Sequence, residues 1–126
     1  ASAGIINDWQ ISLEIYNHIC CLSGTIRDLA QLGMLLVDCP NLSWLQHCRT
    51  VKALMMTSGL YQASGPFAVR VGLPTKSGVS GIILSLVPHQ GVMACYSPPL
   101  DAEGNSLVGL LIVEKLSQTL GLSIFD

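Results

Sequence analysis

The sequence predicts an α+β domain in which helices come first, an antiparallel β-hairpin follows, and one helix ends the chain. Up to Gly59, apolar residues recur at three- and four-residue intervals, which is the spacing of a helical face. The stretch from Gly78 to Tyr96 is rich in Ile, Leu and Val and contains one turn. Helical spacing returns after Ser106. The 126 residues are the length of one domain.

The first half of the chain predicts three helices. Ile11 to Leu22 carries its apolar residues on one helical face. Thr25 is the expected N-cap of the second helix, because Asp28 stands three residues later as an acidic capping-box partner. This helix is expected to end near Cys39-Pro40, and a third to run roughly from Leu45 to Thr57.

The pattern changes after the third helix. Phe67 to Val71 alternates loosely, and Gly72-Leu73-Pro74 breaks the alternation. Gly78 to Val87 is typical of a strand that is buried on both faces. Pro88-His89-Gln90-Gly91 predicts a turn and Val92 to Tyr96 a second strand, so the two strands should pair as an antiparallel hairpin.

The last helix begins where Asn105 or Ser106 can cap it, and its apolar residues extend to Leu120. Because two strands do not make a stable sheet, the order of helices, strand, strand and helix is typical of the second half of a larger α+β domain. Residues 1–126 are therefore expected to form a single partial domain.

The composition favours a large buried interface. Half of the residues are hydrophobic and only 11% are charged, against about 25% in typical domains. One face is therefore expected to be covered by another polypeptide, as in a homo-oligomer, or by a missing part of the same domain. The longest apolar run, Leu107 to Val113, is far shorter than the roughly 20 residues of a membrane-spanning helix. A net charge of −2, with scattered Lys and Arg, offers no surface for nucleic acid.

Five cysteines without regular spacing indicate reduced, mostly buried thiols, as in a cytoplasmic protein, and not a disulfide framework. No secretory signal peptide is visible, which also favours the cytoplasm. Together with His18 and His47 the cysteines could suggest zinc, but their spacing matches no zinc pattern. No metal or other cofactor is expected.

The densest group of chemically useful residues surrounds Lys76-Ser77-Gly78. A Lys and a Ser at the start of a buried strand place a cation and a hydroxyl at the edge of a sheet, where a glycine lets a ligand approach the backbone. The N–H of Val79 can then point at a bound carbonyl oxygen as one half of an oxyanion hole. The Lys-Thr-Gly box of penicillin-binding proteins and class A β-lactamases has this arrangement. For the tripeptide alone, a glycine-containing turn into a core strand is the commoner explanation.

Four ordered segments are more distinctive as a set. They are Ser58-Gly59-Leu60-Tyr61-Gln62-Ala63-Ser64-Gly65, Val71 to Val79, Ser97-Pro98-Pro99-Leu100-Asp101 and Gly104-Asn105-Ser106. In this order and spacing they resemble consecutive motifs of the glutaminase family. Its members are serine-dependent enzymes of the β-lactamase-like fold that hydrolyse L-glutamine to L-glutamate and ammonia. Tyr16 followed by Cys20 is similar to the family's Tyr-x-x-x-Cys segment, so the resemblance covers nearly the whole chain.

The resemblance implies roles for four residues. Tyr61 resembles the active-site tyrosine, which contacts the substrate and moves a proton near the nucleophile. Tyr16 resembles the tyrosine that helps to hold the amino-acid head of the substrate. Val79 resembles the residue whose backbone N–H binds the reacting carbonyl, and Lys76 beside it supplies positive charge.

The nucleophile is missing from the chain. The family's nucleophilic Ser lies in a Ser-x-x-Lys, and none occurs in these 126 residues. The resemblance places that motif in an N-terminal half, upstream of the matched stretch. The chain is therefore expected to be the C-terminal half of a glutaminase and to be inactive alone. The alternative is a diverged or truncated, non-catalytic module that assembles with a partner or with itself.

Overall fold

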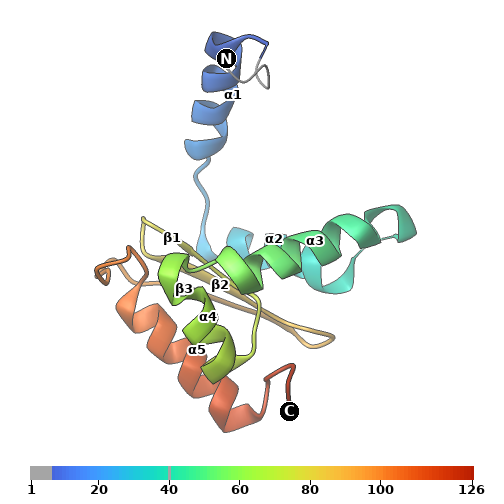
Figure 1. The fold of residues 1–126 in the computed structure, drawn as a ribbon, viewed down its shortest axis with the longest axis vertical. Helices are drawn as coiled ribbons and strands as arrows, with labels where there is room; N and C mark the ends of the chain where they lie inside the picture. Colours follow the sequence, from blue (N-terminus) through green and yellow to red (C-terminus); the bar gives the residue numbers. More distant parts are fainter. Residues whose placement is uncertain (1–6, 40) are drawn as a thin grey trace.

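The computed structural model describes residues 7–39 and 41–126, and it confirms the predicted α+β class. The first elements are the helices α1 (Trp9–Cys20), α2 (Ile26–Asp38) and α3 (Leu42–Ser58), the short 3-10 helix η1 (Tyr61–Ala63) and α4 (Ser64–Val71). The remaining elements are the strands β1 (Thr75–Gly78), β2 (Ile82–Val87) and β3 (Gly91–Tyr96) and the helix α5 (Leu107–Leu120). Figure 1 shows a sheet with helices on both sides and with α1 held away from it.

The three strands form one antiparallel sheet in the order β1-β2-β3. The central strand, β2, is buried on both faces, as the sequence predicts. Ile83 and Val87 point to one face, where they pack with residues of α4 and α5. Leu84 and Leu86 point to the other face, where they pack against α2 and α3. The period-two alternation of a strand thus divides the core into two layers.

The expectation of a single strand from Gly78 to Val87 is wrong at its start. A turn at residues 79–81 separates β1 from β2, and in it the Gly81 N–H donates to the Gly78 carbonyl at 2.9 Å. The Lys-Ser-Gly segment is therefore part of an edge strand of its own. The predicted hairpin of β2 and β3 is present, but it belongs to a three-stranded sheet.

The additional strand escapes sequence analysis because its buried side chains are polar. Thr75 and Ser77 are both buried, and Lys76 between them is exposed. The Thr75 hydroxyl lies 2.7 Å from that of Ser85, and the Ser77 hydroxyl donates to Asn105 Oδ1 at 2.6 Å. Hydrogen bonds of this kind offset the cost of burying a hydroxyl, so β1 needs no apolar alternation.

The loosely alternating segment from Phe67 to Val71 is helical, not extended, and lies in α4. Phe67 and Val71 are four residues apart, so they lie on the same face of the helix, and both are buried in the core. The alternation was therefore a fragment of helical spacing.

The predicted helix starts are confirmed at α2 and α5. The Thr25 hydroxyl accepts from the Asp28 N–H at 3.2 Å, and an Asp28 carboxylate oxygen accepts from the Thr25 N–H at 2.7 Å. The carboxylate also accepts from the Thr25 hydroxyl at 2.8 Å, and its hydrogen bonds from the Thr25 N–H and hydroxyl lower the pKa of Asp28. Of the two candidates for the last helix, Ser106 is the N-cap, since it accepts from the Gly109 N–H at 3.2 Å. Pro40, near which α2 was expected to end, lies outside the described residues.

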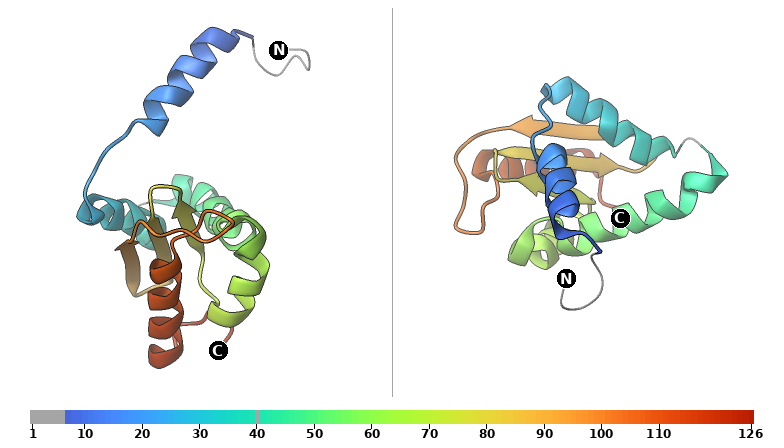
Figure 2. Two further views of the ribbon diagram at one scale, coloured as in Figure 1. Left: turned by 90° about the vertical axis from the view of Figure 1, so that its left-hand side faces the viewer. Right: turned by 90° about the horizontal axis from the view of Figure 1, so that it is seen from above.

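Helix α1 stands apart from the sheet and its other helices in both Figure 1 and Figure 2. None of its residues is buried. Its apolar face, which carries Ile11, Ile15 and Ile19, is therefore uncovered in this structure. The low charge content of the sequence predicts such a face, which needs a partner surface to remove it from water.

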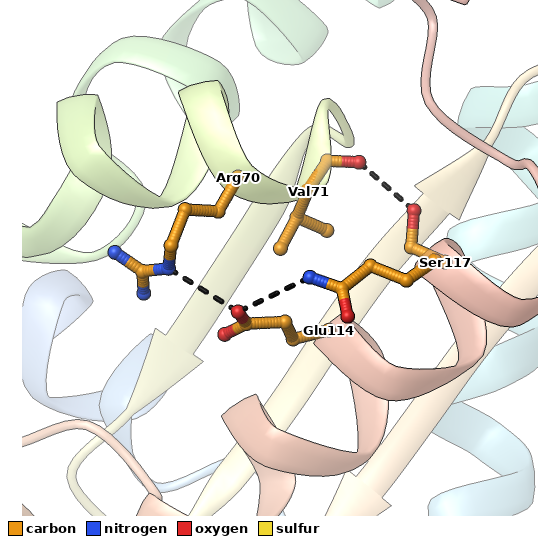
Figure 3. A network of polar contacts seen from close by, with 5 residues as sticks. Arg70, Val71, Glu114 and Ser117 are labelled. Atoms are coloured by element: carbon orange, nitrogen blue, oxygen red, sulfur yellow. Dashed lines mark hydrogen bonds and ion pairs between the residues drawn. The ribbon is translucent and has the colours of Figure 1, made fainter.

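Helices α4 and α5 are joined by two polar contacts, which Figure 3 shows from close by. The Ser117 hydroxyl donates to the Val71 carbonyl at 2.9 Å, and Ser117 is only 2% exposed. Arg70 Nε lies 3.3 Å from Glu114 Oε1, but the Arg70 side chain is 51% exposed. Water competes with the ion pair and not with the buried hydrogen bond.

We therefore expect the buried hydrogen bond to contribute more to the free energy of unfolding than the exposed ion pair does. Ser117→Ala should lower the free energy of unfolding by about 2 kcal/mol, because the buried Val71 carbonyl loses its side-chain donor. Glu114→Gln should lower it by about 0.5 kcal/mol or less, since exposed ion pairs contribute little. Urea unfolding of the full-length protein measures both, and equal losses would contradict this ranking.

Candidate active site

The structure brings three of the four predicted site residues together beside β1. Tyr61 follows α3, Lys76 lies in β1, and Val79 lies in the turn after it. Lys76 Nζ is 5.5 Å from the centroid of the Tyr61 ring. A Cβ built on Gly104 would lie 3.8 Å from Val79 Cγ1 and 3.9 Å from Tyr61 Cε2, so this glycine stands between the two side chains. We call Tyr61, Lys76, Val79 and Gly104 the candidate site.

Lys76 supplies the positive charge of the candidate site. Its ammonium group donates to the Ser77 carbonyl and lies over the face of the Tyr61 ring, in a cation–π contact. Partial burial lowers the pKa of Lys76, because desolvation disfavours the charged form. The position of the amine beside the Tyr61 ring places a cation in the candidate site.

Tyr61 presents its phenol at the surface from an unusual backbone conformation. Its φ is 54°, in the left-handed region that a bulky residue rarely adopts. Leu60, directly before it, is 1% exposed in the core, whereas Tyr61 is 46% exposed. Two consecutive side chains therefore lie in different surroundings, that of Leu60 in the core and that of Tyr61 beside Lys76.

Val79 offers a free backbone donor at the same place. Within residues 7–39 and 41–126, no group accepts a hydrogen bond from its N–H. Its side chain is exposed, so the turn is open to a ligand. A backbone N–H beside a cation can stabilise the oxyanion that forms when a carbonyl is attacked.

Two buried side chains that sequence analysis did not select as site residues connect these elements. Asn105 Nδ2 donates to the Leu60 carbonyl at 3.3 Å, and Asn105 Oδ1 accepts from the Ser77 hydroxyl. Ser64 forms hydrogen bonds on either side of the Leu60-Tyr61 pair. Both residues belong to the distinctive segments, which was the only available signal, since Ser and Asn are usually exposed.

The structure does not bring Tyr16 to the candidate site. This residue lies on α1, which stands apart from β1 (Figure 2), and the Tyr16 side chain is exposed. A hydrogen bond with the thiol of Cys20, one helical turn later, raises the pKa of Tyr16. The role of Tyr16 stays a prediction.

Curated proteins similar to this chain are glutaminases. A family model described as glutaminase matches residues 1–125. The glutaminase of Klebsiella pneumoniae subsp. pneumoniae is 45% identical over 127 residues, and the alignment covers 94% of this chain and 41% of the relative. That of an Enterobacter species is 43% identical over 126 residues, with the same coverage. The chain therefore spans about two fifths of the length of these relatives.

Solved structures show the same similarity. A probable glutaminase from Bacillus subtilis, complexed with 6-diazo-5-oxo-L-norleucine, has a TM-score of 0.78 at 38% identity, over 89% of this chain and 41% of that one. A B. subtilis glutaminase in covalent complex with 5-oxo-L-norleucine, formed by reaction with 6-diazo-5-oxo-L-norleucine, has a TM-score of 0.72 at 36% identity, over 80% and 39%. These matches confirm the predicted likeness to the β-lactamase-like fold. With its matched motifs, its fold and these relatives, the chain belongs to the glutaminase family.

Proposed function

We propose that this chain is the C-terminal part of an enzyme that hydrolyses L-glutamine to L-glutamate and ammonia. The observation that carries the proposal is the grouping of the Tyr61 ring, the Lys76 amine and the Val79 side chain beside one strand, with no acceptor in the described residues for the Val79 N–H. The B. subtilis relative supports it, because covalent capture by 6-diazo-5-oxo-L-norleucine requires a nucleophile in that protein.

In this proposal the nucleophile is the Ser of a Ser-x-x-Lys in the N-terminal half. Its hydroxyl attacks the γ-carboxamide and gives up its proton to the Tyr61 phenol oxygen, which hands a proton on, and the resulting oxyanion accepts a hydrogen bond from the Val79 N–H. Tyr61 passes a proton to the leaving nitrogen, so that ammonia departs and an acyl-enzyme ester remains, which water then hydrolyses to L-glutamate. Lys76 supplies positive charge, and Tyr16 holds the amino-acid head of the substrate.

The missing N-terminal half is also the proposed partner of the uncovered apolar surface. Besides the exposed face of α1, the chain has a groove lined by Leu22, Ile26, Leu32, Ile82 and Tyr96. Burying these side chains against the rest of the domain removes apolar area from water, which stabilises the assembled enzyme. A homo-oligomer of the full-length protein is expected to bury further surface.

The second candidate is a non-catalytic module, which the uncovered apolar face also favours. If the chain pairs with a second copy of itself, its mass in solution is that of a dimer or larger. A stable, soluble monomer of the 126-residue chain would contradict both this module and the argument that the apolar face must be covered.

We also propose that the protein acts in the cytoplasm, and the five free thiols support this location. The expectation that these thiols are mostly buried is wrong: Cys48 is buried, Cys39 and Cys95 are partly buried, and Cys20 and Cys21 are exposed. In residues 7–39 and 41–126, no helix has the length and apolar character needed to cross a membrane.

The direct test of the proposed activity is ammonia release from L-glutamine by the full-length protein. Absence of ammonia release would overturn the proposed glutaminase function.

A further inference from the structure

We propose that Ser64 is a positioning residue that imposes the strained backbone of Tyr61 and thereby holds the phenol over Lys76. Its effect on turnover rests on the proposed glutaminase function. Its effect on the conformation of Tyr61 does not depend on that function.

The strain at Tyr61 is local and unusual. Among the described residues, three besides glycine have positive φ: Cys39, Tyr61 and His89. Cys39 caps the end of α2 and His89 lies in the turn between β2 and β3, where positive φ commonly ends an element. Tyr61 instead begins η1. A left-handed conformation brings Cβ too close to the following carbonyl oxygen, so the surroundings must hold an aromatic residue there.

Ser64 makes the hydrogen bonds that can impose this conformation. Its hydroxyl accepts from the Leu60 N–H at 2.9 Å and donates to the Tyr61 carbonyl at 2.8 Å. One hydroxyl thus fixes the polar groups at both ends of the Leu60-Tyr61 pair. Ser64 is 3% exposed, so water cannot replace either bond without opening the core.

The same turn is anchored to the strand that carries Lys76. The Ser77 N–H donates to the Gly59 carbonyl at 3.1 Å. Asn105 donates to the Leu60 carbonyl and accepts from the Ser77 hydroxyl. Because these atoms are buried, the position of Tyr61 relative to Lys76 is set by hydrogen bonds and not by the contact of the two exposed side chains themselves.

The first test is a double-mutant cycle in the full-length protein. Ser64→Ala should lower kcat for L-glutamine roughly tenfold or more, because a small misplacement of a reacting group is costly. In a Tyr61→Phe background the same change should have little further effect on kcat, since the hydroxyl that it positions is gone. Loss of the same factor in both backgrounds would show that Ser64 acts without Tyr61 and would overturn the proposal.

Ser117→Ala is the matched control. Ser117 is also a buried serine, 2% exposed, whose hydroxyl donates to a backbone carbonyl at 2.9 Å, but it joins α5 to α4. It should lower stability as Ser64→Ala does and leave kcat unchanged. An equal loss of kcat in both variants would reduce the role of Ser64 to general stability.

The second test is a crystal structure of the full-length Ser64→Ala protein, which needs no activity. We expect φ of Tyr61 to become negative and the phenol to leave Lys76, whereas a φ that stays near 54° would overturn the proposal. If the unmutated protein releases no ammonia, the proposed function fails while this structure still decides the inference.

If Ser64→Ala does not fold, Tyr61→Gly replaces it. Glycine adopts positive φ without strain, so the Tyr61→Gly protein should resist urea at least as well as the parent protein. Clear destabilisation of the Tyr61→Gly protein would show that the backbone at Tyr61 is not strained.

Discussion

Tyr61→Phe in the full-length protein is expected to lower kcat for L-glutamine hydrolysis about 100-fold or more, the range in which positioned proton donors act. The variant removes the phenol hydroxyl and keeps the ring that Lys76 contacts at 5.5 Å. Because the side chain is half-exposed, stability should hardly change. Steady-state ammonia release and urea unfolding measure the two effects separately.

Tyr96→Phe is the matched control for this change. Tyr96 is another exposed tyrosine, at the end of β3, and it is not a member of the candidate site. Its ring lines the groove proposed to meet the N-terminal half, and Tyr96→Phe keeps this ring, so we expect kcat to stay unchanged. Near-normal kcat in Tyr61→Phe would remove the Tyr61 hydroxyl from the mechanism.

Gly59→Ala is expected to destabilise the protein by about 3 kcal/mol or more, because α3 approaches β1 so closely at this residue. A Cβ at Gly59 would lie 1.8 Å from the Thr75 carbonyl oxygen and 2.3 Å from the Met55 carbonyl oxygen. Both are backbone atoms: relief of the Thr75 clash requires the end of α3 to separate from β1, and relief of the Met55 clash requires the last turn of α3 to distort. The turn that carries Tyr61 would shift with them, and kcat should fall as well.

The control for this prediction is Gly65→Ala, in α4. A Cβ there meets no atom within 4 Å, and alanine favours a helix over glycine by up to about 1 kcal/mol. In urea unfolding of the full-length variants, the free energy of unfolding should therefore fall in Gly59→Ala and rise in Gly65→Ala. If the Gly59→Ala protein is as stable as the Gly65→Ala protein, α3 does not approach β1 as closely as described.

The sequence predicts those parts of the fold in which local chemistry and burial agree. Thr25 and Asp28 fill the first turn of α2 as their spacing requires, and the strand pair of β2 and β3 follows from apolar residues around one turn. The edge strand was missed because its inward residues, Thr75 and Ser77, are hydroxyl-bearing. Only their partners in three dimensions make such residues suitable for a core.

The candidate site was predictable from motif resemblance and not from periodicity. The motifs selected Tyr61, Lys76 and Val79, and the structure groups them. They gave no reason to expect the left-handed backbone at Tyr61 or the buried hydroxyl of Ser64 beside it. Those features depend on how η1 is seated against β1, which no local pattern encodes.

The central claim, that this chain is one part of a glutaminase site, is tested most directly by measuring ammonia release from L-glutamine. The full-length protein and the 126-residue chain are assayed side by side, with the full-length Tyr61→Phe protein as a third sample. We predict activity in the full-length protein, a large loss in Tyr61→Phe and none in the chain alone, which contains no Ser-x-x-Lys. Absence of ammonia release from the folded full-length protein would contradict the account and favour a non-catalytic module.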